Sequence, residues 1–199
     1  MKIFSQQHIF GYSWEQVSSA NWKKYPNEMS THVIAVDVLR REIDPETNIL
    51  KTERLLTCKQ AVPRWLLTLV GGQEVSYVRE VSEVDLKKRT LVLRSVNLTM
   101  NNLLFVYETV MYKPDPTNPT FATVFNQEAQ ITAFGSFKRL CNKIEEWSVD
   151  RFQSNASLGR AGFESVLNKV TNTVHEGESV LEIMTERVKE GVFLKNKAV

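Results

Sequence analysis

The chain has 199 residues, of which 42% are apolar and 24% charged, so it suits one globular domain with a tail and is too short for two sizeable domains. Its formal charge of +2 and its pI near 8.5 give no general attraction to nucleic acid, although local basic patches can still meet anionic lipid. No stretch approaches the roughly 20 apolar residues of a membrane-spanning helix, and the first residues lack the pattern of a signal or transit peptide, so we expect a soluble, uncleaved protein.

The first predicted elements are a strand and a short helix. Lys2 to Phe10 is expected to form a strand. Ser13 is a plausible N-cap for a helix from Trp14 to Lys24, in which apolar residues such as Val17 recur near helical spacing. Pro26 then ends the helix, because proline cannot continue it.

Six further segments are rich in β-branched, aromatic and leucine residues and are separated by turn residues. They run from Thr31 to Glu42, Leu50 to Cys58, Glu74 to Glu83, Thr90 to Leu98, Leu103 to Tyr112 and Phe121 to Ala133. With the first strand they make seven strands, which we expect to form a meander. Several are apolar on both sides, for example Phe105 and Tyr107 on one side and Leu104 and Val106 on the other. This predicts a sheet covered on both faces, by helices and either bound ligand or further protein.

The segment at residues 62–72, VPRWLLTLVGG, is apolar on nearly all sides and interrupts the strands where a short polar turn is usual. Two interpretations stay open. It is either a one-turn helix that closes one end of the sheet, or a hinged lid that covers a cavity or enters a membrane.

The clearest periodic element is a long helix over residues 136–170. Apolar residues from Phe137 to Val170 recur at steps of three and four, while most charges fall on the opposite side. If continuous, the helix would be about 50 Å long, enough to cross the sheet, although Gly159 and Gly162 could bend it. Residues 171–199 are polar, with a weak helical run around Val180 to Val188, and are predicted to be a mobile tail.

No catalytic or metal-binding pattern is present. Cys58 and Cys141 lie far apart without a C-x-x-C motif or histidines at metal-ligand spacing, so we expect two reduced, packed thiols and no metal or cofactor. A G-x-S-x-G motif is also missing, and we expect no catalytic residues. RNA binding through Lys87, Lys88 and Arg89 is a weak alternative, because this triplet sits in an apparent hairpin turn without interleaved aromatic residues.

Several stretches resemble the PRELI/MSF1 family, closest to its slowmo-like branch, which contains yeast Ups-type phosphatidylserine carriers. These are NWKKYPNEMSTHVIAVDVLRRE, TERLL, VREVSEVD, QEAQITA and CNKIEEWSVDRFQSNASLGRAGF, and the resemblance covers roughly residues 1–170. It implies an α+β fold of the START/PITP-like kind, in which a curved seven-stranded antiparallel sheet and helices enclose a lipid tunnel, with residues 62–72 as an Ω-loop lid.

The resemblance also implies an activity and its setting. The expected activity is non-enzymatic transfer of phospholipid from the outer to the inner mitochondrial membrane. The expected location is the mitochondrial intermembrane space, where the protein is soluble or peripheral on the inner membrane. The expected partner is a small twin-Cx9C helical-hairpin protein, together with transient contact with anionic membranes and no nucleic acid.

Carried over by position, the resemblance implies three sets of site residues. The lipid headgroup would meet cations at the mouth of the tunnel, namely Lys24, His32, Arg54 and Arg151. Lid and membrane contact would come from Val62, Pro63, Trp65, Leu66 and Leu69. The tunnel and core would be lined by Trp147, Phe105 and Tyr107.

Each headgroup candidate has an alternative role. Lys24 could be a solvated helix end, favoured by the helix dipole. His32 could be a hydrogen-bonded wall residue. Arg54 could pair with Glu53 or Glu80, and Arg151 with Glu145 or Glu146.

One departure from the family pattern bears on the cargo. Where relatives selective for phosphatidic acid carry lysines near the lid, this chain has Cys58 and Ala61 and keeps only Lys59 and Arg64 nearby. A less cationic mouth suits a phosphate that still carries an esterified group, so phosphatidylserine is the expected cargo. Phosphatidic acid and a non-lipid binding module remain the alternatives.

Overall fold

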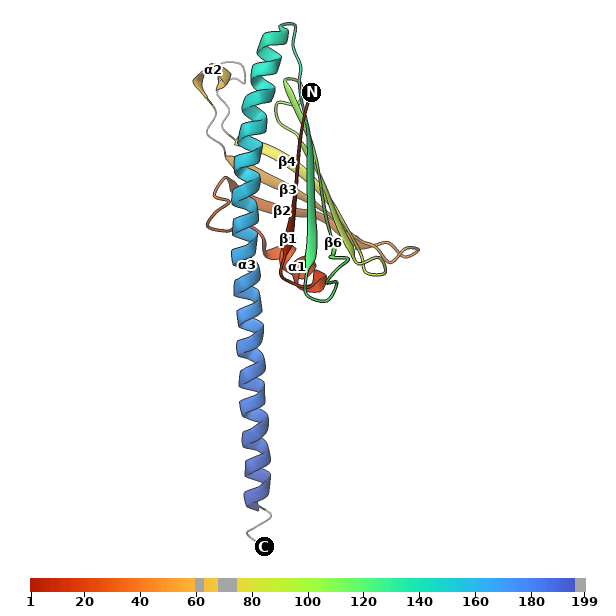
Figure 1. The fold of residues 1–199 in the computed structure, drawn as a ribbon, viewed down its shortest axis with the longest axis vertical. Helices are drawn as coiled ribbons and strands as arrows, with labels where there is room; N and C mark the ends of the chain where they lie inside the picture. Colours follow the sequence, from red (N-terminus) through yellow and green to blue (C-terminus); the bar gives the residue numbers. More distant parts are fainter. Residues whose placement is uncertain (60–62, 68–74, 196–199) are drawn as a thin grey trace.

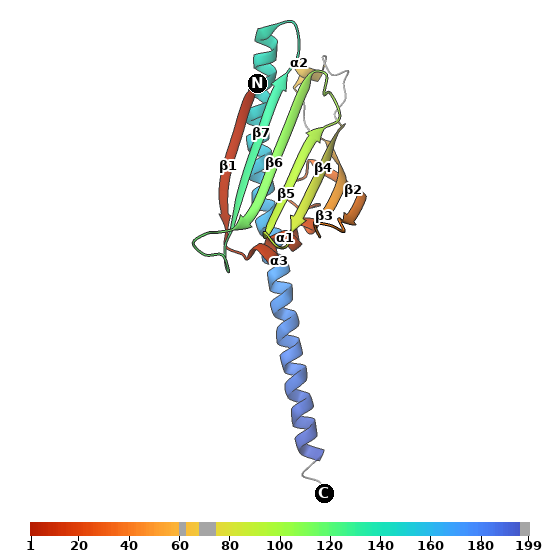
Figure 2. The ribbon, with the colours of Figure 1, turned by 90° about the vertical axis from the view of Figure 1, so that its right-hand side faces the viewer.

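The computed structural model describes residues 1–59, 63–67 and 75–195 and shows one curved antiparallel sheet of seven strands (Figure 1, Figure 2). The strands are β1 (Lys2–Phe10), β2 (Val33–Ile43), β3 (Leu50–Lys59), β4 (Val75–Asp85), β5 (Thr90–Asn97), β6 (Leu104–Pro114) and β7 (Thr123–Ala133). Their order is β1-β7-β6-β5-β4-β3-β2, so β2 to β7 form the expected meander and β1 is added beside β7. All seven predicted strands begin and end within two residues of those observed, and β4 and β6 each end two residues later than expected.

The predicted helix from Trp14 to Lys24 is divided into two parts. Helix α1 (Trp14–Ala20) is followed directly by a 3-10 turn, η1 (Asn21–Lys23). Ser13 is confirmed as the N-cap, because its side chain accepts a hydrogen bond from the backbone of Gln16 and the Gln16 side chain accepts one from the backbone of Ser13.

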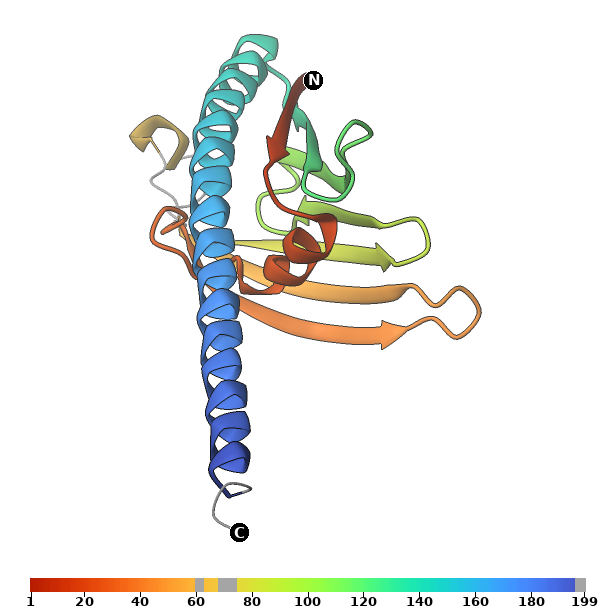
Figure 3. The same ribbon diagram turned by 60° about the horizontal axis from the view of Figure 1, so that its bottom comes forward.

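Helix α3 (Lys138–Lys195) crosses the concave side of the sheet and then extends well beyond it (Figure 1, Figure 3). Its 58 residues correspond to about 87 Å at 1.5 Å per residue. The helix is continuous through Gly159 and Gly162 and runs past Val170, the predicted end. None of the described helices combines the length and apolarity needed to cross a bilayer.

The strands have one buried face and one exposed face, so the expectation that both faces are covered is wrong. Buried and more accessible residues alternate along β3, β4 and β7, with the buried ones toward α3. On the other side, Tyr77 is 43% exposed and Phe105 37%. Their apolar character misled the prediction, because such side chains can shield one another on an open sheet face.

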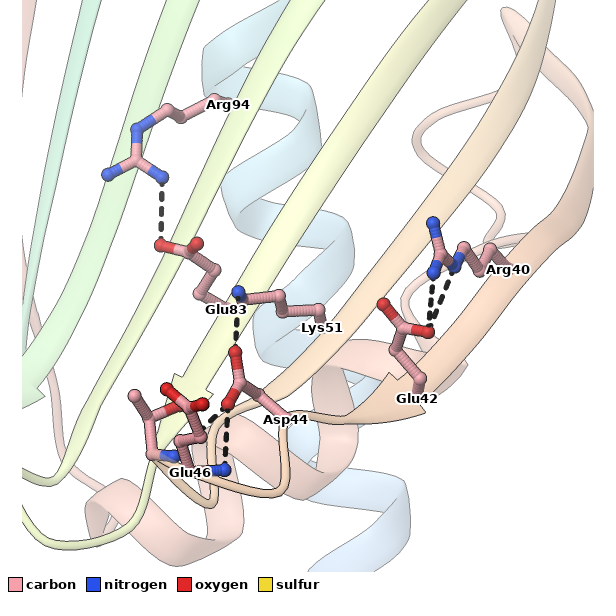
Figure 4. A network of polar contacts seen from close by, with 8 residues as sticks. Arg40, Glu42, Asp44, Glu46, Lys51, Glu83 and Arg94 are labelled. Atoms are coloured by element: carbon pink, nitrogen blue, oxygen red, sulfur yellow. Dashed lines mark hydrogen bonds and ion pairs between the residues drawn. The ribbon is translucent and has the colours of Figure 1, made fainter.

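Ion pairs also mark this outer face (Figure 4). Arg94 Nη1 lies 3.0 Å from Glu83 Oε2, and Lys51 Nζ lies 3.0 Å from Asp44 Oδ2. Asp44 also accepts backbone hydrogen bonds in the turn between β2 and β3, and the bonds from Lys51 and this turn lower its pKa to about 2. These pairs are solvated, so each contributes little to stability.

The tightest packing lies at one end of the sheet. Rings from β1, β6, β7 and α3 form an aromatic cluster with centroids 5.2–6.3 Å apart, made of Phe10, Tyr112, Phe125 and Phe163. Trp14 and Val17 of α1 pack against this cluster and are almost fully buried. The interior is therefore closed at this end, and the space described next lies above it.

Candidate functional site: a cavity crossed by a polar row

A cavity of about 280 Å³ lies between the concave face of the sheet and α3. Its floor is the aromatic cluster, and its walls come from β3 to β7, the segment before β2 and the middle of α3. Most of the lining beyond the middle of the sheet is apolar, including Leu56, Val78, Val106, Trp147 and Phe152. The interior of this protein is thus hollow, with a wall suited to hydrocarbon.

A row of polar side chains crosses the sheet at mid-height of the cavity. Strand register sets Arg54 opposite Glu80, Glu80 opposite Ser95, and Ser95 opposite Glu108. Ser95 donates to Glu108 Oε2 over 2.8 Å, and Gln127 donates to Glu108 Oε1. We call this set, Arg54, Glu80, Ser95, Glu108 and Gln127, the polar row. It divides the aromatic floor from the apolar upper wall.

Lys24 lies beside the polar row and not at a solvated helix end. Its amine is 5.3 Å from the centre of the Tyr25 ring and 5.8 Å from that of Phe163. Lys24 is partly buried and is a lining residue of the cavity. Lys23, the neighbouring lysine, is the exposed one.

The charge on Lys24 is favoured in spite of its burial. Removal from water acts to lower its pKa, but Tyr25, Tyr112, Glu108 and Glu80 more than offset this and raise the pKa above its usual value. Burial raises the pKa of Tyr112 to about 12, so this phenol stays protonated at neutral pH. The carboxylates of Glu108 and Glu80 are then the charges that face the ammonium group.

A tight loop holds Lys24 and His32 against α3. Asn27 donates to the carbonyl of Lys24 over 2.7 Å and accepts from the backbone of Ser30 over 2.7 Å. The loop packs directly on Gly162, where an added Cβ would come within 2.2 Å of the Asn27 side chain. Glycine is therefore required there for the close approach of the loop to the helix, which fixes the cations relative to the cavity.

Arg151 and His32 face the same cavity. The Nε of Arg151 is buried and has no hydrogen-bond partner among the described residues. The predicted alternatives are not observed, since Glu145 contacts the N-terminal amine over 2.7 Å and Glu146 contacts Lys2. A buried guanidinium N–H without an acceptor is costly, and an anion in the cavity would supply one.

His32 precedes β2 instead of lying on it, and its pKa is lowered by burial and by the charges of Arg151 and Lys24. The folded protein therefore binds fewer protons than the unfolded chain once the pH falls below the ordinary histidine pKa of about 6.5. We expect the free energy of unfolding of lipid-free protein to decrease as the pH falls from about 7.5 to 5.

Denaturant titrations of lipid-free protein across this range test the pH effect. His32→Gln should reduce the pH dependence, and His8→Gln should reduce it further, because burial and Arg160 also lower the pKa of His8. If His32→Gln leaves the slope of stability against pH unchanged, this assignment fails.

Arg54 does not line the cavity. Its guanidinium donates to Glu80 Oε1 over 2.6 and 2.9 Å, and the side chains are only 4% and 10% exposed. Trp22 covers the arginine, with its ring centre 5.4 Å from the guanidinium carbon. The alternative role, pairing with Glu80, is the one observed.

Of the three predicted lining residues, Trp147 lines the cavity and the two on β6 do not. The inward residues of β6 are Leu104, Val106 and Glu108, so Phe105 and Tyr107 point to the outer face. The prediction for these two residues is wrong, because a strand that is apolar at both parities does not reveal which parity faces inward.

The lid residues are described only in part. Helix α2 (Arg64–Leu67) begins after Pro63, whose carbonyl accepts from the backbone of Leu66 over 2.9 Å. Leu66 is buried, and the ring of Trp65 lies 4.5 Å from Lys143 Nζ, so α2 rests beside the first turns of α3. Val62 and Leu69 lie outside the described residues.

The chemistry of the site is that of binding. Burial raises the pKa of Cys58 to about 11, so this cavity thiol is protonated at neutral pH and is a poor nucleophile. In the described parts of the chain, no three His, Cys, Asp or Glu side chains gather as metal ligands would. The arrangement offers cations to an anion and an apolar wall to hydrocarbon.

Sequence reasoning named Arg54 and its partner Glu80, but it missed Arg160 and the other members of the polar row, Ser95, Glu108 and Gln127. Arg160 lines the cavity and donates to Gln6 over 3.3 Å, and Gln6 in turn donates to Gln127. The sequence did contain a signal for Glu108, because alternation along the strand places it on the same face as Val106 and Val110. A carboxylate on an otherwise apolar face is either paired or functional.

The chain is similar to members of one known protein family. The model of the PRELI-like family matches residues 15–173. The chain is 59% identical to "Protein UPS2, mitochondrial" of Saccharomyces cerevisiae over 84% of its own length and 73% of the relative. It is 54% identical to a UPS-like protein of Schizosaccharomyces pombe, over 88% of the chain and 94% of the relative. A Dictyostelium discoideum slowmo homologue is 34% identical, over 85% of the chain and 73% of the relative.

Solved structures agree on the fold. A Thermus thermophilus protein matches with a TM-score of 0.57 at 12% identity, over 85% of this chain and 99% of that one. A START superfamily protein of Mycobacterium smegmatis matches with a TM-score of 0.50 at 9% identity, over 84% and 98%. The α+β architecture expected from the sequence, a curved seven-stranded antiparallel sheet with helices, is thereby confirmed.

Proposed function

Because the chain belongs to the PRELI-like family, we propose that it is a non-enzymatic transfer protein that carries one phospholipid at a time in this cavity. The observation that supports this most is the joint presence of an apolar wall, buried cations and the unpaired Arg151 Nε in one internal space. The homologue named as mitochondrial supports a mitochondrial location, and we propose the intermembrane space as the compartment.

The energetics of lipid extraction require such a space. A two-chain phospholipid leaving a bilayer exposes on the order of 30 methylenes at about 0.8 kcal/mol each, so a carrier must replace more than about 20 kcal/mol of apolar burial. An open groove with water on one side would replace only part of this. The long apolar wall between the polar row and the far ends of β4, β5 and β6 is suited to the acyl chains.

The polar row suggests how the lipid lies. We propose that the phosphate sits inside, near Lys24, His32 and Arg151, and that the acyl chains run toward the end of the sheet where α2 lies. An anionic phosphate at the row meets cations that protein atoms hold in position, whereas acyl chains at the row would leave the buried Arg151 Nε without an acceptor. Helix α2 is the candidate lid that moves when lipid passes.

Phosphatidylserine is the favoured cargo. Its phosphate and carboxylate are acceptors for the cations, and its ammonium group needs an acceptor of its own. Glu108 supplies a carboxylate on the cavity wall, where it already accepts from Ser95 and Gln127 and retains further acceptor positions. Phosphatidic acid has no ammonium group and would gain nothing from this carboxylate.

A transfer assay between liposomes tests the cargo. We expect Glu108→Gln to lower phosphatidylserine transfer about tenfold, because a hydrogen bond to a charged group contributes about 1.5–3 kcal/mol. Transfer of phosphatidic acid should be unchanged or faster, since a like charge is removed. Glu128→Gln on the neighbouring strand β7 is the matched control, because Glu128 is exposed.

The assay can reject either the ammonium contact or the proposed function as a whole. Equal loss of both lipids in Glu108→Gln would reject the ammonium contact. A wild-type protein that transfers neither lipid would reject the proposed function and favour a non-lipid binding module.

The partner and the route are part of the same proposal. We propose that the protein works as a complex with a small twin-Cx9C helical-hairpin protein and shuttles lipid from the outer to the inner mitochondrial membrane. Copurification of such a hairpin protein with the full chain from mitochondria, and its loss after disulfide reduction, would support this assignment. Recovery of the chain without any partner of this class would contradict it.

A further inference from the structure

The loop between β7 and α3 carries two strongly exposed aromatic rings. Phe134 is 45% exposed and Phe137 is 75% exposed, with only Gly135 and Ser136 between them. Met1 is 72% exposed and lies close by, since the N-terminal amine contacts Glu145 in the third turn of α3 over 2.7 Å. A single exposed ring is ordinary, but a group of large apolar side chains at one tip marks an interaction surface.

Hydrogen bonds hold the two rings in a fixed arrangement. The Phe134 backbone donates to the carbonyl of Leu103 over 2.8 Å, which ties the loop to the start of β6. The carbonyl of Phe137 accepts from Leu140 and Cys141 over 3.0 and 3.1 Å, which makes it the first acceptor of α3. The loop is thus attached firmly at both ends and presents its rings outward.

The charges next to the rings are positive. Lys138 and Arg139 follow Phe137 directly and are exposed, and no carboxylate in the described part of the chain pairs with either. The nearby acidic residues are engaged, because Glu145 contacts the N-terminal amine and Glu146 contacts Lys2. The N-terminus of α3 adds the positive end of the helix dipole. Exposed rings within a positive field complement an anionic lipid surface.

The loop lies near one end of the cavity. The loop lies at the same end of the molecule as α2 and the chain's N-terminus (Figure 1, Figure 2). The cavity reaches this end, since Thr99, Met100 and Leu104 line it where β5 and β6 meet their connecting loop. Phe134 is bonded to the residue just before Leu104.

We propose that the Phe134–Phe137 loop is a membrane-docking site that inserts both rings into an anionic bilayer and brings the lipid-exit end of the cavity to its surface. The inference rests on the proposed function. The loop would then contact the membrane in addition to α2.

The experiment measures binding of the full chain to vesicles of equimolar phosphatidylcholine and phosphatidylglycerol by flotation. The variant Phe134→Ser/Phe137→Ser should bind at least about tenfold more weakly, because the burial of two large apolar side chains is lost. The control Phe121→Ser removes a ring that is 68% exposed at the opposite end of β7 and should bind like the wild type. Lys138→Gln/Arg139→Gln should weaken binding to these vesicles more than to pure phosphatidylcholine.

The inference is overturned if the double phenylalanine variant floats like the wild type, or if Phe121→Ser loses as much binding. The bound lipid of each purified variant, identified by mass spectrometry, keeps the two proposals distinct. Normal lipid content with lost flotation supports the docking site, whereas a wild-type protein that holds no phospholipid overturns the proposed function itself.

Discussion

Replacing Lys24 by glutamine is expected to reduce lipid occupancy and phosphatidylserine transfer by about tenfold to a hundredfold. The amine lines the cavity and interacts with the Glu108 and Glu80 carboxylates of the polar row, and a charge-assisted hydrogen bond to phosphate contributes about 1.5–3 kcal/mol. Glutamine keeps most of the side-chain length, so the loss should come from the missing charge. The measurement is the rate of labelled phosphatidylserine transfer between liposomes, with phospholipid per protein determined on the same samples.

Lys23→Gln is the control for Lys24→Gln. It removes the same charge from the adjacent residue, which is exposed and does not line the cavity, so transfer should stay within a factor of about two of the wild type. Thermal unfolding of both variants should show intact folds. Equal transfer by Lys24→Gln and the wild type would remove Lys24 from the headgroup site.

Breaking the Arg54–Glu80 pair is expected to have the largest effect on stability. Arg54→Met leaves the Glu80 carboxylate buried without its partner, which costs about 3–5 kcal/mol. At about 2–4 °C per kcal/mol for a chain of this size, Tm should fall by roughly 6–20 °C. The double variant Arg54→Met/Glu80→Met should regain most of this loss, because no unpaired charge remains. Differential scanning calorimetry on the lipid-free protein provides the test.

An exposed pair on the same two strands serves as the control. Arg79 and Glu53 also join β3 to β4, but on the outer face, with side chains 47% and 27% exposed. Arg79→Met should therefore leave Tm close to that of the wild type, because a solvated pair contributes little to stability. If instead Arg54→Met keeps the wild-type Tm and loses lipid, Arg54 contacts the headgroup, as the family resemblance implied.

The sequence predicted the fold well where local signals agree. Turn residues separate the seven strands clearly, so the strands were found with nearly correct ends, and the Ser13 cap and apolar periodicity gave the starts of α1 and α3. The continuation of α3 to Lys195 was missed, because a polar stretch can remain helical without an apolar face to identify it.

The site was harder to predict because it depends on register and strand parity. That Arg54 lies opposite Glu80, and Ser95 opposite Glu108, follows only from the pairing of strands. Phe105 and Tyr107 were assigned to the wrong face, since their strand is apolar at both parities. Lys24 was identified from the family resemblance, but its deep position depends on the contact between its loop and Gly162.

The polar row separates a packed region of the interior from an unfilled one. The aromatic cluster below it is packed tightly and sustains the fold, whereas the apolar wall above it is unfilled. Because the buried charges lie between these regions, changes to the row should affect both stability and binding. The two variants above separate these effects, since Arg54 lies outside the cavity lining and Lys24 is part of it.

Native mass spectrometry of the full chain, isolated from mitochondria without detergent, tests the central claim most directly. If the cavity carries phospholipid, the protein should appear with one bound molecule whose fragments are those of a glycerophospholipid, with phosphatidylserine predominant. Ala156→Trp, which fills the cavity wall on α3, should remove that molecule, while Ala161→Trp on an exposed part of the same helix should retain it. A protein that carries no lipid, or equal lipid in both tryptophan variants, would contradict the account.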